Sequence, residues 1–299
     1  MHFSQRNIAR ALTISLVCLI IVFAAEAATG EPRTIRVGFY NTENYFDTIN
    51  DPACDDARYC DPKLYNFTEK TQELSAAISL FSPDILALCE VENYSTVLAL
   101  TESLSELTHR NYGIIHYDSK DSRGIDVAAV YDTTLMTLIS SEPIFTDYLW
   151  RNFIRAEFCS KLSGENFTLF IAHLPSKLGG SRATENREKA LRALDSLALA
   201  EESLRAIICG DMNDNPKEGK ILYNLALSAQ KQGKGSYAYR GSWSMPDQII
   251  ITPELKRNLL SDQIIVHHPS LIERKGRYKG YPQKNHPSDH LPIFIDIIL

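Results

Sequence analysis

The chain alternates short apolar runs with longer segments whose apolar residues repeat with the period of a helix. The runs typical of β-strands are residues 33–40, 84–89, 112–117, 126–131, 134–140, 152–158, 167–173, 204–209, 248–252, 263–267 and 291–298. The segments typical of helices are residues 68–81, 94–109, 182–199 and 221–230. Strands that alternate with helices, together with strands that follow one another as a meander, predict a mixed α/β (α+β) sandwich. In such a fold two sheets pack face to face and the helices lie outside them.

The length and charge of the chain limit the functions that it can have. It has 299 residues, of which 44% are hydrophobic, which is enough to bury the core of one large domain. The net charge of −6 argues against a protein that mainly coats nucleic acid, because nonspecific affinity comes from Lys and Arg side chains. A hydrolase that makes a few local phosphate contacts is still compatible with this charge.

The N-terminus has the pattern of an export signal. Arg6 and Arg10 flank the start of a mostly apolar stretch over residues 11–25, and Ala25-Glu26-Ala27 matches a small-residue cleavage site. We therefore expect residues 1–27 to be a cleaved signal peptide and residues 33–299 to form the folded domain. The mature protein would then be periplasmic or extracellular, with no integral membrane segment. A retained anchor is the alternative, although the stretch is shorter than the roughly 20 apolar residues that span a bilayer.

Export also bears on the six cysteines of the chain. Cys18 lies in the signal segment, while Cys89 and Cys209 lie in apolar runs and are typical of small buried residues. Cys54 and Cys60 lie in a polar loop, and we expect them to form a local disulfide in an oxidising compartment. No Cys-x-x-Cys pair is present, so the sequence does not indicate a zinc site of that type.

Polar side chains that suit metal and phosphate chemistry border several of the apolar runs. They are Asn41 and Glu43, Glu90, His173, Asp211 and Asn213, and Asp289 and His290. A buried strand that ends in an unpaired carboxylate or imidazole is costly unless that group has a partner or a function. Each position, taken alone, is also compatible with an ordinary turn or a satisfied surface group. Together they predict one shared pocket that binds a metal ion.

The residue types suggest roles within that pocket. Glu90 offers the hard oxygen ligand that Mg²⁺ prefers. His173 has a side chain that titrates near neutrality, which suits proton transfer to a leaving oxygen. Ser176 and Lys177 follow it and add hydrogen-bond donors for an oxyanion.

Two further positions are candidates from the same reasoning. Asp247 precedes an apolar run, where a carboxylate can hold the tautomer of a catalytic imidazole such as that of His290. Arg123 precedes another apolar run and is either a phosphate clamp or a solvated loop charge.

In chain order these residues resemble the endonuclease/exonuclease/phosphatase superfamily, which has the DNase I-like fold. The resemblance extends from about Ile35 to the C-terminus. It rests on the ordered set Asn41-x-Glu43, Glu90, Arg123-Gly-Ile-Asp126, His173, Gly210-Asp-x-Asn213, Asp247 and Ser288-Asp-His290. The first motif, Asn-x-Glu-Asn-x-Phe-Asp at residues 41–47, is most similar to a secreted bacterial branch. The resemblance implies a four-layer α/β/β/α sandwich and hydrolysis of phosphate esters with Mg²⁺ or Mn²⁺.

The resemblance also implies which residues hold the metal and contact the phosphate. Glu90 would be the principal metal ligand, with Asn41 and Glu43 supporting the site. Asp289 would contribute to the metal site or to its water, and Asn213 would contact the phosphate.

The same resemblance implies the catalytic roles. Asp211 would position or deprotonate the attacking water. His290, oriented by Asp247, would stabilise the charge of the transition state, and His173 would protonate the leaving oxygen.

The substrate is the least constrained part of the prediction. A phosphodiesterase or endonuclease that acts on nucleic acid as a monomer ranks first. The alternative is an inositol- or lipid-phosphate phosphatase or a sphingomyelinase-like enzyme. The basic residues that suit nucleic acid are Arg182, Arg187, Arg274, Lys275, Arg277, Lys279 and Lys284, the last five interleaved with Tyr278 and Tyr281. A catalytically inactive binding module would be expected to have lost part of the set Glu90, Asp211, Asp289 and His290, which is complete here.

Overall fold

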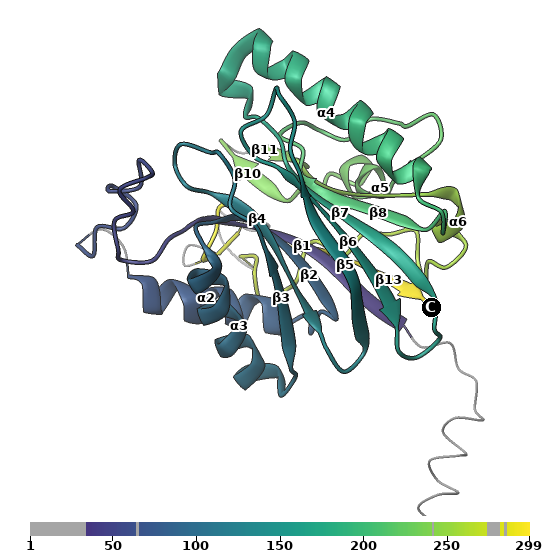
Figure 1. Cartoon of the computed structure of the whole chain (residues 1–299), viewed down its shortest axis with the longest axis horizontal. Coiled ribbons are helices and arrows are strands. Elements are labelled where there is room, and N and C mark those ends of the chain that lie inside the picture. Colours follow the sequence, from purple (N-terminus) through teal and green to yellow (C-terminus); the bar gives the residue numbers. More distant parts are fainter. Residues whose placement is uncertain (1–33, 64–65, 241, 274–281, 284–285) are drawn as a thin grey trace, which may run out of the picture. The chain divides into compact units, whose positions relative to one another are not determined.

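The computed structural model of the chain describes residues 34–63, 66–240, 242–273, 282–283 and 286–299. The expected signal segment lies outside the described residues, as does most of the basic loop that precedes the last strand. None of the helices in these ranges is long and apolar enough to cross a membrane. Two large β-sheets, a small two-stranded sheet and the helices beside them make up the described structure (Figure 1).

The first sheet has five strands in the order β13-β1-β2-β4-β3. These strands are β1 (Thr34–Tyr45), β2 (Ile85–Val91), β3 (Tyr112–His116), β4 (Asp126–Asp132) and β13 (Ile293–Ile298). β1 and β2 run parallel, and the other neighbouring strands of this sheet are antiparallel. The carboxyl ends of β1 and β2 therefore lie at the same edge of the sheet.

The second sheet has six strands in the order β5-β6-β7-β8-β12-β9. These strands are β5 (Met136–Ile144), β6 (Phe153–Ser160), β7 (Asn166–His173), β8 (Ala206–Asp211), β9 (Tyr223–Asn224) and β12 (Asp247–Ile251). β7 and β8 are parallel, with His173 opposite Asp211, while β12 is antiparallel to β8, with Asp247 opposite Asp211. Three of the predicted site residues are thus neighbours at one sheet edge.

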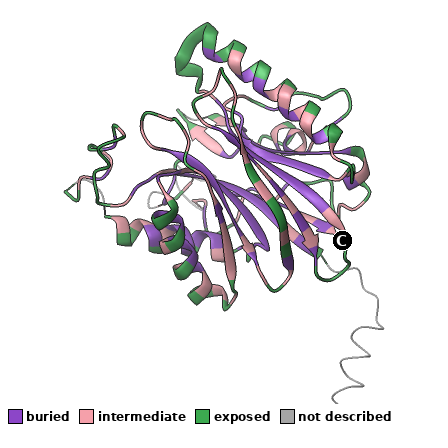
Figure 2. Ribbon diagram, in the orientation of Figure 1, coloured by how far each residue is buried: buried purple, intermediate pink, exposed green. Residues whose placement is uncertain are grey.

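The two sheets pack face to face over a shared apolar core (Figure 2). Successive side chains of a strand point to opposite faces, so one strand can serve two layers. Leu169 and Ile171 of β7 enter the core between the sheets, where Val37 of β1 also lies. Phe170 of the same strand faces the other way, against Leu194 of a long helix. Burial of each such side chain contributes roughly 1.5–3 kcal/mol.

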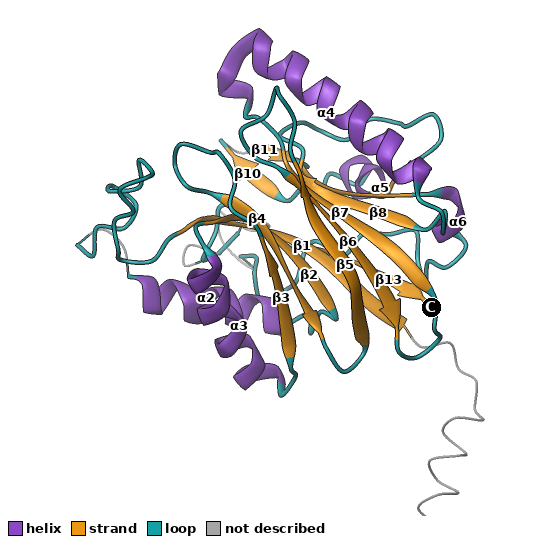
Figure 3. Cartoon of the chain, in the orientation of Figure 1, coloured by secondary structure: helices purple, strands orange, loops and turns teal. Residues whose placement is uncertain are grey.

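Helices cover the outer faces of both sheets (Figure 3). The helical elements are α2 (Phe67–Ser79), α3 (Tyr94–Thr108), η1 (Lys177–Gly179), α4 (Gly180–Ala200), α5 (Ala226–Lys231) and α6 (Pro253–Lys256). The side chain of Asn66 accepts the backbone N–H of Glu69 and begins α2, and Asn93 and Thr96 form a capping box that begins α3. α2 and α3 flank the five-stranded sheet, whereas α4 packs on the six-stranded one. The predicted sandwich of two mixed, mostly antiparallel sheets with helices outside is confirmed.

Two predictions of local structure are wrong. Residues 221–230 do not form one helix, because Asn224 pairs with β12 and its side-chain oxygen accepts the N–H of Ala226, where α5 begins. Residues 263–267 form no strand beyond a single bridge between Ile265 and Phe294. The hairpin of β10 (Tyr237–Tyr239) and β11 (Ser242–Ser244), whose strands are three residues long, was not predicted.

The expected disulfide between Cys54 and Cys60 is also wrong, since both residues are free thiols. The two sulfurs face different partners. Sγ of Cys60 contacts the carbonyl of Ala57 within its own turn, at 3.7 Å. Sγ of Cys54 instead lies near Gly124, where an added Cβ would be only 2.9 Å from the sulfur.

Candidate active site

The strand ends that carry the predicted site residues meet across the two sheets. Nδ2 of Asn41, at the end of β1, donates to Oδ2 of Asp211, at the end of β8, over 3.1 Å. Oγ of Ser288 donates to the carbonyl of Asn41 over 2.7 Å, which joins the segment before β13 to the same point. Clusters that are 170 and 247 residues apart in sequence therefore form one site.

Unusual backbone geometry turns the ends of β1 and β2 into this site. The pairing register of β1 and β2 shifts between Asn41 and Tyr45, as it does after Cys89 in β2. Glu43, Asn44 and Glu90 adopt left-handed backbone conformations, with φ of 53°, 51° and 60°. Such conformations cost non-glycine residues on the order of 1 kcal/mol or more each, and bulges of this kind re-aim side chains beside functional sites.

Glu90 lies in the middle of the site. Its Oε2 accepts the backbone N–H of Asn44 over 2.9 Å, which fixes the orientation of the carboxylate. Its Oε1 makes no hydrogen bond within the described residues and lies 3.8 Å from Nε2 of His173 and 4.0 Å from Nη2 of Arg123. Nη1 of Arg123 donates to Oδ1 of Asn44, so this arginine belongs to the site rather than to a solvated loop.

Asp211 is buried and held on both carboxylate oxygens. Its Oδ1 accepts the N–H of Asn213 over 2.8 Å, and its Oδ2 lies 3.8 Å from Nε2 of His173. Burial, and then repulsion from Asp247, raises the pKa of Asp211 to about 7 against the opposing effect of His290. Nδ2 of Asn213 donates to the carbonyl of Leu174, which ties the two loops together.

His290 and Asp247 form a buried pair. Nδ1 of His290 lies 2.6 Å from Oδ2 of Asp247, and both side chains are almost fully buried. Burial opposes the charged imidazole, but the adjacent Asp247 carboxylate outweighs it and raises the pKa of His290 to about 10. The ring of Tyr237 packs 4.9 Å from the ring of His290, centroid to centroid. The pair is therefore an imidazolium–carboxylate at neutral pH.

Glu43 and Asp289 form the other acidic group. Oε2 of Glu43 accepts the backbone N–H of Asp289 over 2.6 Å. Nζ of Lys70, on α2, donates to the carbonyls of Glu43 and Pro287 and so joins the two segments. Burial, opposed by His290 but supported by Glu43 and Glu90, raises the pKa of Asp289 to about 6.

His173 is buried at the end of β7. Its Nδ1 has no hydrogen-bond partner among the described residues. Burial, and then the neighbouring Arg151 and Arg123 cations, lowers the pKa of His173 well below its ordinary value. Arg151 donates to the carbonyls of His173 and Leu174 over 3.0 and 3.2 Å, which fixes the turn after β7.

Not every predicted residue reaches the site. Oγ of Ser176 accepts the N–H of Leu178 and caps the short helix η1, and Nζ of Lys177 forms an ion pair with Asp214 at 2.7 Å. Both side chains are exposed and engaged elsewhere. Arg187, a candidate for nucleic-acid contact, is buried and donates to the carbonyl of Pro175, so it supports the loop from within.

Three side chains of the site were not predicted. Lys70 and Arg151 donate hydrogen bonds to backbone carbonyls of distant segments. Such contacts depend on the fold and cannot be recognised from a sequence pattern. Tyr237 lies in a strand of three residues. The alternation of Tyr237 and Tyr239 across Ala238 was the available sign of a strand there.

The donor set fits a hard divalent cation. Glu90, Glu43 and Asp289 supply carboxylate oxygens of the kind that Mg²⁺ and Mn²⁺ prefer. Repulsion among these carboxylates contributes to the raised pKa of Asp289, and a bound cation would relieve that repulsion. Ligand atoms of Asp211, Asp247 and His290 all lie within 4.8 Å of one another, which those of Glu90, Glu43 and Asp289 do not, but Nδ1 of His290 is occupied by its hydrogen bond to Asp247.

The described domain matches one family model over nearly its whole length. The family is described as the endonuclease/exonuclease/phosphatase family, and the match covers residues 36–298. A search of curated protein sequences finds no match.

Solved structures with the same fold come from bacteria and animals. An endonuclease/exonuclease/phosphatase from Bacteroides vulgatus is 17% identical, with a TM-score of 0.62, and the alignment covers 89% of this chain and 99% of that one. TDP2 of D. rerio, complexed with a single-strand DNA product, is 16% identical, with a TM-score of 0.59 and the same coverage. A mannosyl-6-phosphatase of Bacteroides thetaiotaomicron is 16% identical, with a TM-score of 0.57, and covers 89% of this chain and 100% of its own. At these identities the likeness concerns the fold.

Proposed function

Because the chain belongs to the endonuclease/exonuclease/phosphatase family, whose members are metal-dependent phosphoesterases, we propose that it hydrolyses phosphodiesters, with nucleic acid as the first candidate substrate. The observation that carries this proposal is the hydrogen bond between Asn41 and Asp211, which joins the two sheets at the point where all the predicted clusters meet. An inactive binding module is disfavoured, because the carboxylates and the buried Asp247–His290 pair are all present at one site.

We assign the metal ion to the group of Glu90, Glu43 and Asp289. Glu90 is the central ligand in this assignment, because its Oε1 is left without a hydrogen bond in the described structure while its Oε2 is fixed by Asn44. A bound Mg²⁺ or Mn²⁺ would neutralise charge on the phosphate and favour ionisation of the attacking water.

The remaining residues act on the phosphate and on its two ester oxygens. Asp211, held by Asn41 and Asn213, orients the attacking water and accepts its proton. The imidazolium of His290 donates from Nε2 to a phosphate oxygen, since its Nδ1 is bound to Asp247. His173, at the end of β7, protonates the leaving oxygen. The negative charge of a bound phosphate raises the proton affinity of His173 for this step.

A phosphomonoesterase is the second candidate, and the mannosyl-6-phosphatase among the similar structures favours it. Inositol phosphates and phospholipids belong to the same group of alternatives. We also propose that the enzyme acts as a monomer. Its export after removal of residues 1–27 is a separate proposal that rests on the sequence pattern alone.

A panel of substrates tests the proposal. Plasmid DNA, RNA, bis-p-nitrophenyl phosphate, mannose 6-phosphate, inositol phosphates and sphingomyelin would each be incubated with Mg²⁺, Mn²⁺ or EDTA. Cleavage of DNA, RNA or the synthetic diester that EDTA abolishes is the expected result. Turnover restricted to the monoesters would favour the second candidate, and no turnover of any substrate would refute both.

A further inference from the structure

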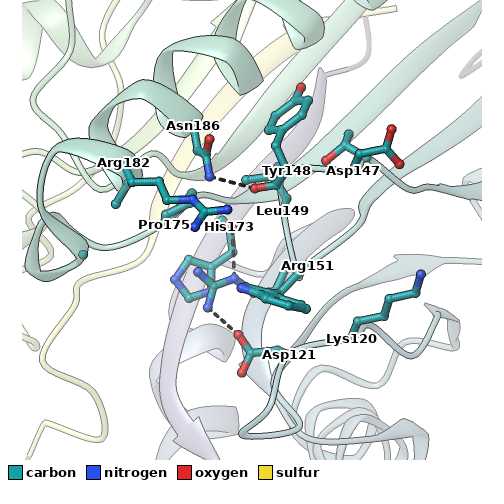
Figure 4. Close-up of a pocket in the computed structure, with 14 residues that line it drawn as sticks. Lys120, Asp121, Asp147, Tyr148, Leu149, Arg151, His173, Pro175, Arg182 and Asn186 are labelled. Atoms are coloured by element: carbon teal, nitrogen blue, oxygen red, sulfur yellow. Dashed lines mark hydrogen bonds and ion pairs between the residues drawn. The ribbon is translucent and has the colours of Figure 1, made fainter.

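We infer that the cavity beside His173 is a subsite for the leaving group, and that it takes a nucleotide: an aromatic ring with an additional phosphate. This inference rests on the proposed function, because it assumes that a phosphate ester binds against His173. The cavity has a volume of about 620 Å³ and lies between the loop from β5 to β6 and the start of α4 (Figure 4). It opens onto His173, which lines it, so a group esterified to the phosphate on that side would enter it.

The walls of the cavity are held in place by hydrogen bonds. Nδ2 of Asn186 on α4 donates to the carbonyl of Tyr148 over 2.9 Å, and the N–H of Lys120 donates to the carbonyl of Trp150 over 2.9 Å. Nη1 of Arg151 forms an ion pair with Asp121 at 3.1 Å. Three separate segments are therefore fixed around one space, as expected of a preformed binding site.

Two residues that line the cavity each carry a buried polar atom without a hydrogen-bond partner among the described residues. Nδ1 of His173 and Oγ1 of Thr146 are both inaccessible and make no hydrogen bond in the described part of the chain. A buried polar atom without a partner costs about 1–3 kcal/mol, so such atoms are uncommon away from sites of binding or catalysis. Two of the seven such atoms in the described residues belong to residues of this lining, although neither atom is itself exposed in the cavity.

Trp150 indicates the aromatic part of that ligand. Its side chain lines the cavity yet is 74% exposed, so a large apolar surface faces solvent next to the reacting centre. The backbone N–H of Lys120 donates to the carbonyl of Trp150, which fixes the backbone from which the indole extends. An exposed indole beside the cavity is a stacking surface for a planar base.

The charges of the cavity indicate the phosphate. Lys120, Arg151 and Arg182 line it together with the carboxylates Asp121 and Asp147. Arg151 is paired with Asp121, whereas the side chains of Lys120 and Arg182 form no ion pair within the described ranges. Arg182 and Lys120 lie on opposite sides of Arg151 and His173 in Figure 4. Nζ of Lys120 lies 5.6 Å from the centre of the Phe145 ring, so its charge is not neutralised by a carboxylate. Cations without a carboxylate partner suit a leaving group with its own negative charge, which an uncharged hexose lacks.

A binding measurement in EDTA tests the subsite separately from catalysis. The dissociation constant of thymidine 3′,5′-bisphosphate would be compared with those of deoxyribose 3′,5′-bisphosphate, which lacks the ring, and of thymidine 3′-monophosphate, which lacks one phosphate. The full protein is expected to bind the first probe about tenfold more tightly than the ring-less one, as stacking on one aromatic side chain predicts. Trp150→Ala should remove that preference, and Trp150→Phe should keep part of it.

Arg182→Ala and Lys120→Ala should instead reduce the preference for the bisphosphate over the monophosphate. Arg257→Ala is the matched control, because Arg257 is exposed directly after α6 and, among the described residues, its side chain pairs with Glu254. Equal affinities for the probes, preferences that survive Trp150→Ala, or tighter Trp150-dependent binding of mannose 6-phosphate would overturn the inference. If the unaltered protein shows the expected binding preferences but has no diesterase activity, the proposed function would be refuted and the nucleotide site would still be supported.

Discussion

Oδ2 of Asp247 lies 2.6 Å from Nδ1 of His290, although the two residues come from β12 and from the segment before β13. The hydrogen bond fixes the imidazole so that only Nε2 can act on a substrate. It also places the buried negative charge that keeps the imidazole protonated.

The first prediction concerns this pair. His290→Ala should lower kcat on bis-p-nitrophenyl phosphate by about 10²–10³, as expected for loss of a charged donor to the transition state. Asp247→Ala should cause a loss of similar order, and the double variant should be little worse than either single one, because the two residues act as a unit. Multiplicative losses in the double variant would show that they act independently.

The second prediction concerns the metal. Glu90→Gln should weaken Mg²⁺ binding at least about tenfold, because the variant loses the charge of the central ligand. Mg²⁺ at about 100 times its Kd should stabilise the unaltered protein by about 2.7 kcal/mol, and this gain should shrink in the variant. Calorimetric titration and thermal unfolding measure both effects. Glu92→Gln is the control, since Glu92 accepts the N–H of Asp47 and should not bind the ion; a comparable loss in that variant would contradict the assignment.

The third prediction concerns the close contact of β7 with β8. A Cβ on Gly210 would lie 2.0 Å from the carbonyl oxygen of Ala172, one residue before the site residues Asp211 and His173 on the two strands. Gly210→Ala should therefore destabilise the fold by about 1–3 kcal/mol in urea unfolding. Gly113→Ala should cost less, because the added methyl meets the end of the movable Tyr131 side chain. Equal stability of Gly210→Ala and the unaltered protein would contradict this prediction, because it would mean that β7 and β8 move apart at no cost in free energy.

The fourth prediction concerns stability and pH. Burial alone would raise the pKa of Glu201, but its hydrogen bonds from Arg155 and Thr168 outweigh that effect and lower it. Glu201→Gln should cost about 2 kcal/mol at pH 7. Because the pKa of Glu201 is lower in the folded than in the unfolded protein, its ionisation stabilises the fold at pH values above the unfolded pKa of about 4.3. This stabilisation is lost as the pH falls through the folded-state pKa. The difference between the two proteins should therefore disappear in strong acid. The exposed Glu254→Gln should change stability by less than about 0.5 kcal/mol, and a pH-independent difference for Glu201→Gln would contradict the account.

Much of the site could be predicted because its residues interrupt apolar patterns. Asp211 and His173 end mostly apolar strands, so their positions indicate both where each strand ends and where the site lies. Parallel pairing of β7 with β8 then places the two side by side, which is a consequence of topology rather than of any local signal. The separation of Asn41 from Asp211 along the chain is too large for a pattern to predict their contact.

Other errors had a signal that was available. Arg187 falls on the same face of α4 as Ala183, Ala190 and Leu194, all of them buried, so the helical period places it inside. Its charge suggested a surface role, but its guanidinium satisfies the carbonyl of Pro175 instead. The free thiols of Cys54 and Cys60 had no such signal, because sequence spacing does not fix the direction of two side chains in a loop.

Hydrolysis of bis-p-nitrophenyl phosphate by the unaltered protein and by Asp211→Asn tests the central claim most directly. The account predicts turnover that requires Mg²⁺ or Mn²⁺ and stops with EDTA. Asp211→Asn should reduce it at least about 10²-fold, because the variant loses the group that accepts the proton of the water. Asp214→Asn, whose carboxylate pairs with Lys177 and Lys217, should retain nearly full activity. Turnover that persists in EDTA, or that Asp211→Asn leaves unchanged, would contradict the claim that these strand ends form one metal-dependent phosphoesterase site.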